Sequence, residues 1–357
     1  MRFLLRAIVI ACFATTAAVP GWTESTAQQR DGGIAVLPIL GSSPEDGVIV
    51  GALGLFYRTP EGATSTDTIS AGVMYGTAGS YALSLSIDRR LGKRGATVLL
   101  DSYVSLFSSE YFGIGMESET SVEYRALETE THVAVLVPVA RRIVAGPAIG
   151  FRFLDVIEVS DDSSPYTETV SPRDRVIAAG AGVRAIVDSR DNTMYPSNGV
   201  FAETASHHYP SQLGSDGGFT IGTVDLRYFT SPLPWLIVGS QVRFEASAGA
   251  VPDLFLPAIG GEELMRGVLS ERFRDQMAIA GQLEFRFPLI GRFGATAFIG
   301  TGQVSASIPE IRLTRFVPAG GAGLRFAIDP KEMLNLRLDF AHDLDSLKVY
   351  VGIMEAF

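Results

Sequence analysis

The sequence predicts an all-β fold, a transmembrane antiparallel β-barrel of about sixteen strands, on three observations. Of its 357 residues, 46% are hydrophobic and 38 are glycine, but only 19% are charged, whereas a soluble domain usually has about a quarter. No window of about 18 uninterrupted apolar residues follows the N-terminal region, which disfavours membrane-spanning helices. Short runs of alternating apolar and polar residues recur instead. A barrel accounts for all three, because only alternate residues of each strand face lipid.

Residues 1–27 have the features of a secretory signal peptide. Arg2 and Arg6 precede an apolar run, and residues 25–27 (Ser-Thr-Ala) fit a small-x-small cleavage site. Cys12 faintly resembles a lipoprotein cleavage site, but the apolar run before it is too short for that. Once this signal is removed the chain has no cysteine, which fits an exported protein that does not rely on disulfides.

The remaining chain is acidic. Removal of residues 1–27 takes away two arginines and one glutamate and changes the formal net charge from −10 to −11. An acidic chain without a basic stripe binds nucleic acid poorly, so we expect no nucleic-acid partner.

The first clear strand signal is the alternation in residues 81–88, where Tyr81, Leu83, Leu85 and Ile87 share one face. The same period occurs in residues 224–229, 240–247, 282–287 and 334–340. The polar faces of these later runs carry charges of both signs, and no helices are predicted that would cover a second layer. In a barrel these faces line the lumen. A large soluble β domain is the alternative that periodicity alone leaves open.

Sixteen runs are counted, an even number as in bacterial single-chain barrels. The expected strands are 47–58, 66–76, 80–90, 95–106, 118–127, 129–140, 142–155, 174–188, 199–209, 218–230, 234–248, 277–287, 292–303, 314–328, 333–342 and 347–357. The expected division is therefore a signal peptide at 1–27, a short periplasmic segment at 28–45 and a barrel domain at 46–357. The longest gap between strands, 249–276, contains the polar sequence GGEELMRGVLSERF.

Five segments carry recognisable motifs. Met265-Arg266-Gly267-Val268 resembles a loop motif of the form (Val/Leu)-Arg-Gly-(Phe/Tyr), with which it shares the Arg-Gly pair. It lies between the eleventh and twelfth expected strands, and LEFRFPL at 283–289 follows it. VDSRDNTMYPSNG at 187–199 has the form Asp-x-Arg-Asp…Pro-x-x-Gly. YFGIG at 111–115 and the aromatic Phe357 complete the set.

Together and in this order, these segments resemble the outer-membrane surface-antigen superfamily, which includes BamA, TamA and the transporters of two-partner secretion. The resemblance covers nearly the whole chain after the signal. It implies a sixteen-stranded outer-membrane barrel whose sixth extracellular loop enters the lumen and whose first and last strands meet at a weak seam. It also implies that Phe357 is the signal read by the assembly machinery.

Two departures from the family pattern stand out. The best-known members carry periplasmic POTRA domains, for which we expect no room in this chain, so it resembles a member without them. The second strand after the loop usually reads Phe-x-Asp-x-Gly in the family, with the acid holding the loop arginine; here it reads FIGTG at 298–302, and the acid is replaced by Gly300.

Arg266 needs other partners, because an unpaired charge in a lumen costs several kcal/mol. Glu284, on the strand after the loop, is the first candidate, and Glu245 and Asp339 are next. The arginine either only pins the loop and stiffens the barrel or serves as a latch that opens during transport; the first interpretation is favoured.

Other charges allow two interpretations each. Asp188, Arg190 and Asp191, with Pro196 and Gly199, form either an ordinary charged turn at the barrel rim or a structural lock of the family type. The inward charges form either a cross-strand network that fills part of the lumen or a selective pore lining. They are Asp225, Arg227, Arg243, Glu245, Glu284, Arg286, Arg325, Arg337 and Asp339.

Enzyme interpretations are weak. His207-His208 is not accompanied by a second ligand cluster of suitable spacing, and His342-Asp343 is an ordinary charged turn. No nucleophile elbow, phosphate loop or nucleotide fingerprint is present. We expect no enzymatic activity, no cofactor and no metal.

The expected function is membrane biogenesis, or translocation of protein or lipid, in the outer membrane of a Gram-negative bacterium reached through a cleaved signal peptide. The alternative is a passive diffusion channel or a structural surface protein. Expected partners are outer-membrane lipid and lipopolysaccharide, the barrel-assembly machinery that inserts this chain, and a periplasmic partner whose identity the sequence does not give.

Overall fold

In a computed structural model of the chain, the described residues are 32–43, 46–59, 66–91, 95–117, 121–159, 175–331, 333–343 and 346–357. The expected signal peptide at 1–27 lies outside them. No helix in this part of the chain is long and apolar enough to span a membrane.

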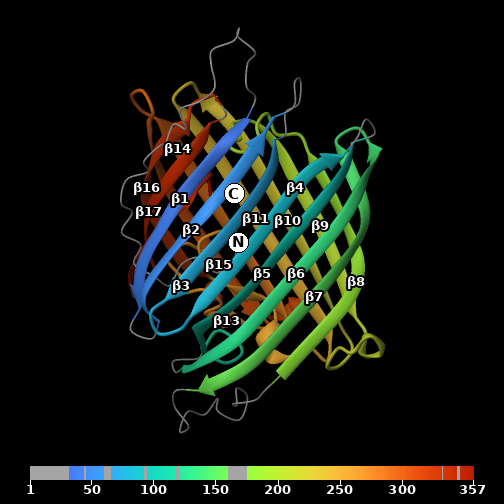
Figure 1. Cartoon of the computed structure of the whole chain (residues 1–357). Helices are drawn as coiled ribbons and strands as arrows, with labels where there is room; N and C mark the ends of the chain where they lie inside the picture. Colours follow the sequence, from blue (N-terminus) through green and yellow to red (C-terminus); the bar gives the residue numbers. More distant parts are fainter. Residues whose placement is uncertain are drawn as a thin grey trace, which may run out of the picture.

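Sixteen strands form one antiparallel sheet, in which neighbours in the sequence are neighbours in space, and the sheet curls into a barrel (Figure 1). Its strands are β1 (Gly32–Ser43), β2 (Gly47–Arg58), β3 (Asp67–Gly76), β4 (Tyr81–Leu91), β5 (Ala96–Tyr111), β6 (Val122–Ala140), β7 (Ile143–Val159), β8 (Arg175–Asp188), β9 (Gly199–Tyr209), β10 (Phe219–Leu233), β11 (Leu236–Gly249), β14 (Met277–Pro288), β15 (Phe293–Ser305), β16 (Val317–Asp329), β17 (Leu334–His342) and β18 (Leu347–Ile353).

The connection between β11 and β14 carries a small sheet of its own. This sheet has two strands, β12 (Ala258–Ile259) and β13 (Phe273–Arg274). Four short 3-10 helices lie in connections: η1 (Ser211–Leu213), η2 (Asp253–Phe255), η3 (Ile308–Glu310) and η4 (Leu313–Arg315).

The expected number of strands is correct, but two assignments behind it are wrong. Residues 32–43, expected within the periplasmic segment 28–45, form β1 and pair with β2 over their whole length. The two strands expected at 118–127 and 129–140 are the single strand β6, whose alternation continues through the polar residues 128–131. Pro38 interrupts the strand signal of β1, yet proline is tolerated there because β1 is an edge strand.

The barrel is apolar outside and charged inside. Along β1 the outward Ile34 and Val36 are exposed and the inward Ala35 and Leu37 are buried. Large apolar side chains are exposed in the same way on strands around the barrel, whereas charged side chains gather in the lumen. This outward apolar face is what a strand that crosses a bilayer requires.

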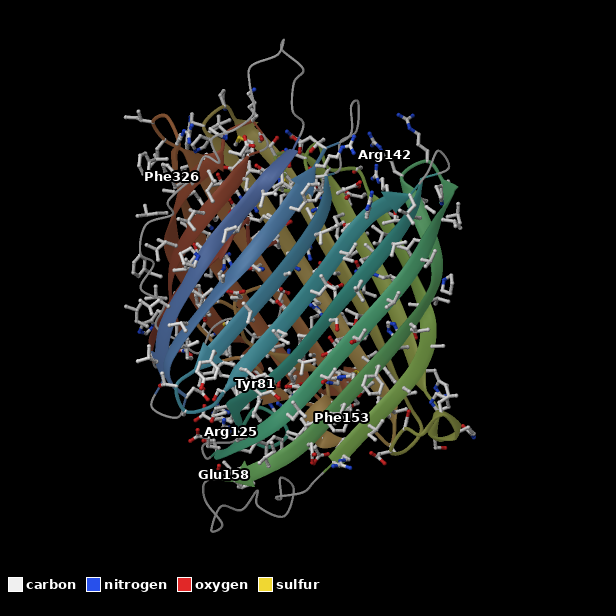
Figure 2. All side chains as sticks on the ribbon, viewed as in Figure 1. Tyr81, Arg125, Arg142, Phe153, Glu158 and Phe326 are labelled. Atoms are coloured by element: carbon white, nitrogen blue, oxygen red, sulfur yellow. The ribbon has the colours of Figure 1, made fainter. Side chains whose placement is uncertain are left out.

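The two ends of the barrel differ. The connections at one end include the two-residue turns at 141–142 and 234–235. The connections at the other end include the long loop 250–276. Figure 2 shows Arg142 near the short-turn end and Glu158 near the long-loop end. In bacterial barrels short turns are periplasmic and long loops extracellular.

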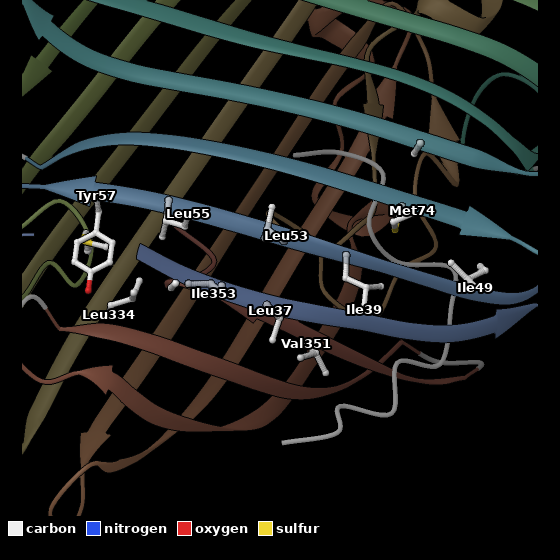
Figure 3. Close-up of a cluster of buried hydrophobic side chains, with 13 residues drawn as sticks. Leu37, Ile39, Ile49, Leu53, Leu55, Tyr57, Met74, Leu334, Val351 and Ile353 are labelled. Atoms are coloured by element: carbon white, nitrogen blue, oxygen red, sulfur yellow. The ribbon is translucent and has the colours of Figure 1, made fainter. Parts of the chain in front are cut away.

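The barrel is not closed by hydrogen bonds. Among the described strands β1 and β18 are the two edges of the sheet, and no register of paired residues joins them. We call this junction the seam. Side chains fill it instead: Leu37 and Ile39 of β1 belong to the same buried apolar cluster as Val351 and Ile353 of β18 (Figure 3).

One polar contact also spans the seam region. The Tyr57 hydroxyl of β2 donates a hydrogen bond of 2.8 Å to Asp329 Oδ2 at the end of β16. The seam is therefore held by packing and side-chain contacts, which are easier to separate than a continuous ladder.

Candidate functional site

Residues 250–276, which we call loop six, fold back into the lumen. Met265 and Val268 are buried and pack in one apolar cluster with Ala278 of β14, Val304 of β15 and Ala319 of β16. Loop six therefore lies against the inner wall formed by the strands that follow it.

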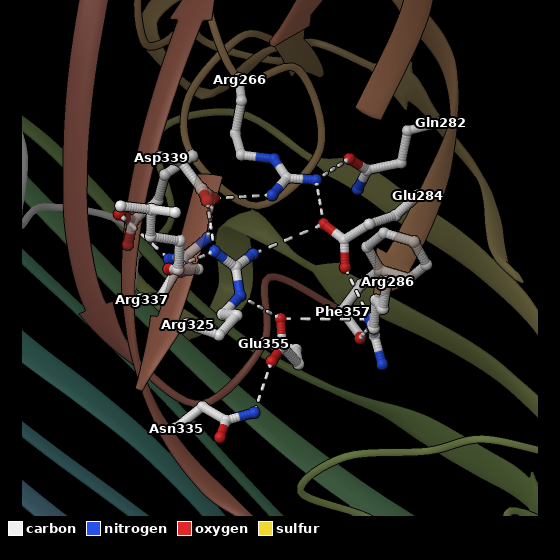
Figure 4. A network of polar contacts seen from close by, with 12 residues as sticks. Arg266, Gln282, Glu284, Arg286, Arg325, Asn335, Arg337, Asp339, Glu355 and Phe357 are labelled. Atoms are coloured by element: carbon white, nitrogen blue, oxygen red, sulfur yellow. Dashed lines mark hydrogen bonds and ion pairs between the residues drawn. The ribbon is translucent and has the colours of Figure 1, made fainter. Parts of the chain in front are cut away.

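Arg266 is at the centre of the contacts that hold this loop (Figure 4). Its side chain is fully buried; Nη1 donates to Asp339 Oδ2 at 2.7 Å and Nη2 to Glu284 Oε2 at 2.6 Å. Its guanidinium group lies 3.6 Å from the centre of the Phe298 ring. Two carboxylates and an aromatic face thus contact the planar guanidinium on separate sides. The ammonium group of a lysine could not make all three contacts.

Two of the three expected partners of Arg266 are confirmed. Glu284 and Asp339 bind it, whereas Glu245 pairs with Arg243 at 3.4 Å on its own strand, β11. Glu245 is excluded because the Arg266 side chain lies against residues of β14, β15 and β17 rather than β11.

Gly300 explains how the loop is held without the acid of the family pattern. It lies opposite Gln282 in the β14–β15 register, and Gln282 Oε1 accepts a hydrogen bond of 3.3 Å from Arg266 Nη2. A Cβ atom at residue 300 would lie 3.5 Å from the Leu264 carbonyl oxygen. The missing side chain therefore leaves room for the loop backbone. The negative charge that Arg266 needs is supplied by Glu284 and Asp339 on other strands.

Further arginines extend this network. Arg325 donates to Asp339 Oδ1 at 2.5 Å and to Glu355 Oε2 at 2.7 Å, and Arg286 donates to Glu284 Oε1 at 2.7 Å. Counting formal charges, we define the ion network as four arginines and four acids: Arg266, Arg286, Arg325, Arg337, Glu262, Glu284, Asp339 and Glu355. The opposite charges balance, as burial demands.

The remaining expected lumen charges lie beside the ion network and are joined to it by hydrogen bonds from Asp225 through Gln241 and Gln282 to Arg266. Asp225, Arg227 and Arg243 line a cavity of about 400 Å³ against β5–β11, together with Glu245 and Glu263 of loop six. Of the two interpretations, the cross-strand network describes the packed half near β14–β18, whereas the charges on β10 and β11 line the cavity.

Two of the histidines line the cavity. His132 and His207 lie in the cavity with ring centres 4.9 Å apart, and His208 is bonded to Thr220. Among the described residues no group of three or more His, Cys, Asp or Glu side chains is placed to hold a metal ion.

Gly267 fixes how loop six meets β17. Its φ is +110°, and a Cβ there would lie 2.8 Å from the backbone carbon of His342. Its N–H donates to the Tyr350 hydroxyl at 3.1 Å, and its carbonyl accepts from Lys348 Nζ. The motif needs glycine here because both the conformation and the close approach exclude a side chain.

We expect Gly267→Ala to lower the free energy of unfolding by about 1–3 kcal/mol, since it adds a backbone clash to strain. The measurement is the temperature at which the folded barrel loses its compact mobility on a gel. The control is Gly261→Ala, which has φ +105° in the same loop but whose Cβ would meet nothing nearer than 3.6 Å. Equal losses in the two variants would show that the approach to β17 is unimportant.

The expected rim motif forms a compact turn at the short-turn end. Arg190 binds Asp188 through Nε at 3.0 Å and Nη2 at 2.8 Å. Gly199 has φ +120°, and a Cβ there would lie 2.5 Å from the Ser189 carbonyl oxygen. The motif also reaches the ion network, because the Pro196 carbonyl accepts a hydrogen bond of 3.2 Å from Arg286 Nη1.

Asp191 organises the same turn. Partial burial alone would raise the pKa of its carboxyl, but the Ser197 hydroxyl and backbone N–H groups of residues 192, 197 and 198 donate to it and hold the pKa below its usual value. This geometry favours the lock interpretation of the rim over a loose charged turn.

The YFGIG segment packs on loop six. The Arg274 guanidinium lies 5.3 Å from the Tyr111 ring centre, and the Gly115 N–H donates to the Arg274 carbonyl at 2.8 Å. Arg272 lies over Phe112 at 4.3 Å. Sequence reasoning missed Arg272 and Arg274, although the alternation Arg272-Phe273-Arg274 close to the loop motif was a usable signal.

The expected strand 347–357 placed Phe357 on the last strand, but the structure does not. Strand β18 ends at Ile353, and the Phe357 ring is buried, stacked on Phe229 with centres 5.9 Å apart. Sequence reasoning also missed Glu355, whose side chain is 1% exposed. The expected role of Phe357 as an assembly signal stays a prediction.

Comparison with known proteins rests on structure alone. No protein family and no curated protein matches the sequence. Among solved structures, BamA from Haemophilus ducreyi lacking POTRA domains 1–3 matches with a TM-score of 0.57 and 12% identity, over 91% of this chain and 70% of that one.

Two further barrels match similarly. CdiB from Escherichia coli has a TM-score of 0.59 at 10% identity, and CdiB from Acinetobacter baumannii 0.52 at 12%. Each match covers 92% of this chain, but only 63% and 60% of the CdiB chains. With sixteen strands, an open seam and an in-folded sixth loop, this chain has the barrel fold of BamA and CdiB.

Proposed function

We propose that this chain is an outer-membrane barrel of the BamA/TamA-like family that acts in membrane biogenesis or in translocation of protein or lipid. The observation that carries the proposal is the seam, where β1 and β18 share packed side chains but no hydrogen-bonded ladder. A diffusion channel has no need of such a junction, whereas a barrel that passes a polypeptide or lipid sideways does.

Loop six supports the same function. Its Met265–Val268 segment packs in the half of the lumen next to the seam and is tied to the wall there by the ion network. Separating the seam while the lumen stays filled would open a path toward the bilayer and not a free aqueous pore.

The test is site-specific photo-crosslinking in the outer membrane. The probe replaces Val36 of β1 or Leu347 of β18, and the control position is Val183 of β8, which is equally exposed on the outer face (61%, 63% and 64%). We expect polypeptide or lipopolysaccharide adducts at the two seam positions well above those at Val183.

A closed seam should abolish these adducts. Leu37→Cys and Val351→Cys, in a background in which the single cysteine Cys12 is serine, would be joined by a bifunctional thiol reagent. If adducts at Val36 and Leu347 match those at Val183, or persist after joining, the translocation proposal is wrong.

The polar cavity favours one second candidate, a passive diffusion channel. Its volume of about 400 Å³ and its charged lining suit water and small solutes. A large, steady conductance of the unmodified barrel in planar bilayers would support the channel. A small and flickering conductance would support the barrel with a labile seam.

A further inference from the structure

The lumen contains a site for a short peptide segment, occupied by residues 354–357 of the chain itself. We call these residues the tail. β18 ends at Ile353, and Met354 adopts a positive φ of 72°, which turns the chain away from the seam. The Met354 N–H donates to the Asn335 carbonyl at 2.8 Å.

The site recognises an acid and an aromatic ring. The two oxygens of Glu355 accept from Arg325 Nε at 2.7 Å and from Asn335 Nδ2 at 2.9 Å. Two residues on, the Phe357 carbonyl accepts from Arg286 Nη2 at 3.1 Å (Figure 4).

A slot on the barrel wall holds the ring of Phe357. A Cβ at Gly239 of β11 would lie 3.1 Å from the Phe229 ring and 3.2 Å from the Phe357 ring. The slot is thus formed by Phe229 on one side and by the absence of a side chain at Gly239 on the other.

Charge makes the tail a required part of the ion network. The barrel wall contributes Arg286, Arg325 and Arg337 against Glu284 and Asp339, an excess of one positive charge. Loop six adds one charge of each sign, Arg266 and Glu262, and therefore changes nothing in this balance. The tail supplies Glu355, which neutralises this excess. Withdrawal of the tail leaves a buried positive charge, which is unfavourable.

The tail and loop six are connected through two residues. Arg325 binds Glu355 and, through Nη1, Asp339 Oδ1; the other oxygen of Asp339 binds Arg266. A second route runs from the Phe357 carbonyl through Arg286 to Glu284 and Arg266. If either the tail or Arg266 is removed, the side chains that connect them lose hydrogen-bond partners.

We propose that this site binds an acid-x-aromatic peptide segment, that the tail is its resident ligand, and that its occupancy is coupled to the docking of loop six. The tail is continuous with the β18 edge, so its release frees that edge of the seam. The role in seam opening rests on the proposed function, whereas the coupling itself is a property of the barrel.

The test measures cysteine labelling in the purified, folded full chain, without any client. Met265→Cys reports on loop six and Ala356→Cys on the tail, both in the Cys12→Ser background. We expect Glu355→Gln to raise the maleimide labelling rate at residue 265, and Arg266→Gln to raise it at residue 356, each by at least about fivefold. Coupling between two sites acts in both directions.

Two further variants separate this effect from general loosening. Gly239→Val fills the ring slot without changing a charge and should also raise labelling at 265. Glu117→Gln, which removes an exposed acid paired with Arg315, should not. Each variant is first shown to keep the heat-dependent gel mobility of a folded barrel.

Unchanged labelling at residue 265 in the folded Glu355→Gln and Gly239→Val variants would overturn the coupling. This conclusion would not depend on whether crosslinked adducts form at the seam. If labelling rises as expected but seam adducts are absent, the coupling stands and the translocation proposal fails. The two outcomes are therefore distinguishable.

Discussion

Replacement of Arg266 by alanine is expected to destabilise the barrel by about 3–5 kcal/mol, the range for removal of one partner from a buried ion pair. The reason is that Glu284 and Asp339 lose a shared donor inside a network that excludes water. The loss of the contact with Phe298 adds to the effect. Arg266→Lys should recover only part of it, because a single ammonium cannot reach both carboxylates and the ring in the same geometry.

The measurement is the midpoint of unfolding in denaturant or heat, followed by gel mobility of the purified barrel. Arg315→Ala is the matched control: Arg315 also pairs with a glutamate, but both side chains are exposed, and such pairs contribute about 0–1 kcal/mol. If Arg266→Ala unfolds at the same midpoint as Arg315→Ala, loop six is not held by this arginine.

Gly300→Asp, which restores the acid of the family pattern, is expected to destabilise this barrel by several kcal/mol. The four arginines of the ion network are already matched in formal charge by four acids, so a fifth carboxylate adds an unbalanced negative charge to a buried site. Its Cβ would also lie 3.3 Å and 3.5 Å from two carbonyl oxygens, those of Gly281 and Leu264.

A double-mutant cycle separates charge from shape. Gly300→Asn has nearly the same shape without the charge, and its smaller loss gives the steric part. In a Glu284→Gln background the new acid replaces a lost one, so Gly300→Asp should cost at least about 1 kcal/mol less there, as expected for residues in one network. A Gly300→Asp barrel as stable as the unmodified one would show that the network tolerates a fifth acid.

Much of the architecture was predictable because a strand's side-chain period is local. Alternation in residues 81–88 or 334–340 identified strands without knowledge of their neighbours. The same rule failed at β1, where Pro38 and two initial glycines weakened the signal. It failed again at β6, where a polar inward face resembled a break. These two errors cancelled in the number of strands.

The candidate site was predictable only in part. Loop six and Arg266 were identified by a motif, and Glu284 by its place on the next strand. The choice of Asp339 over Glu245 was not predictable, since both side chains face the lumen. Only the path of the loop in the folded barrel places Arg266 next to Asp339. Glu355 was missed because its position two residues after β18 suggested a continuing strand, and the turn at Met354 depends on contacts with β17.

The sequence by itself thus determined the all-β class and the number of strands, because each depends on residues close together in the chain. The loop that enters the lumen was expected from the resemblance of its motif to a known family. Only the tertiary structure decided which acids hold Arg266, how the seam is filled and where Phe357 lies. These depend on curling sixteen strands until β1 meets β18 and loop six meets β17. The electroneutrality of the ion network belongs to that second group, since its eight charges come from loop six, the tail and three different strands.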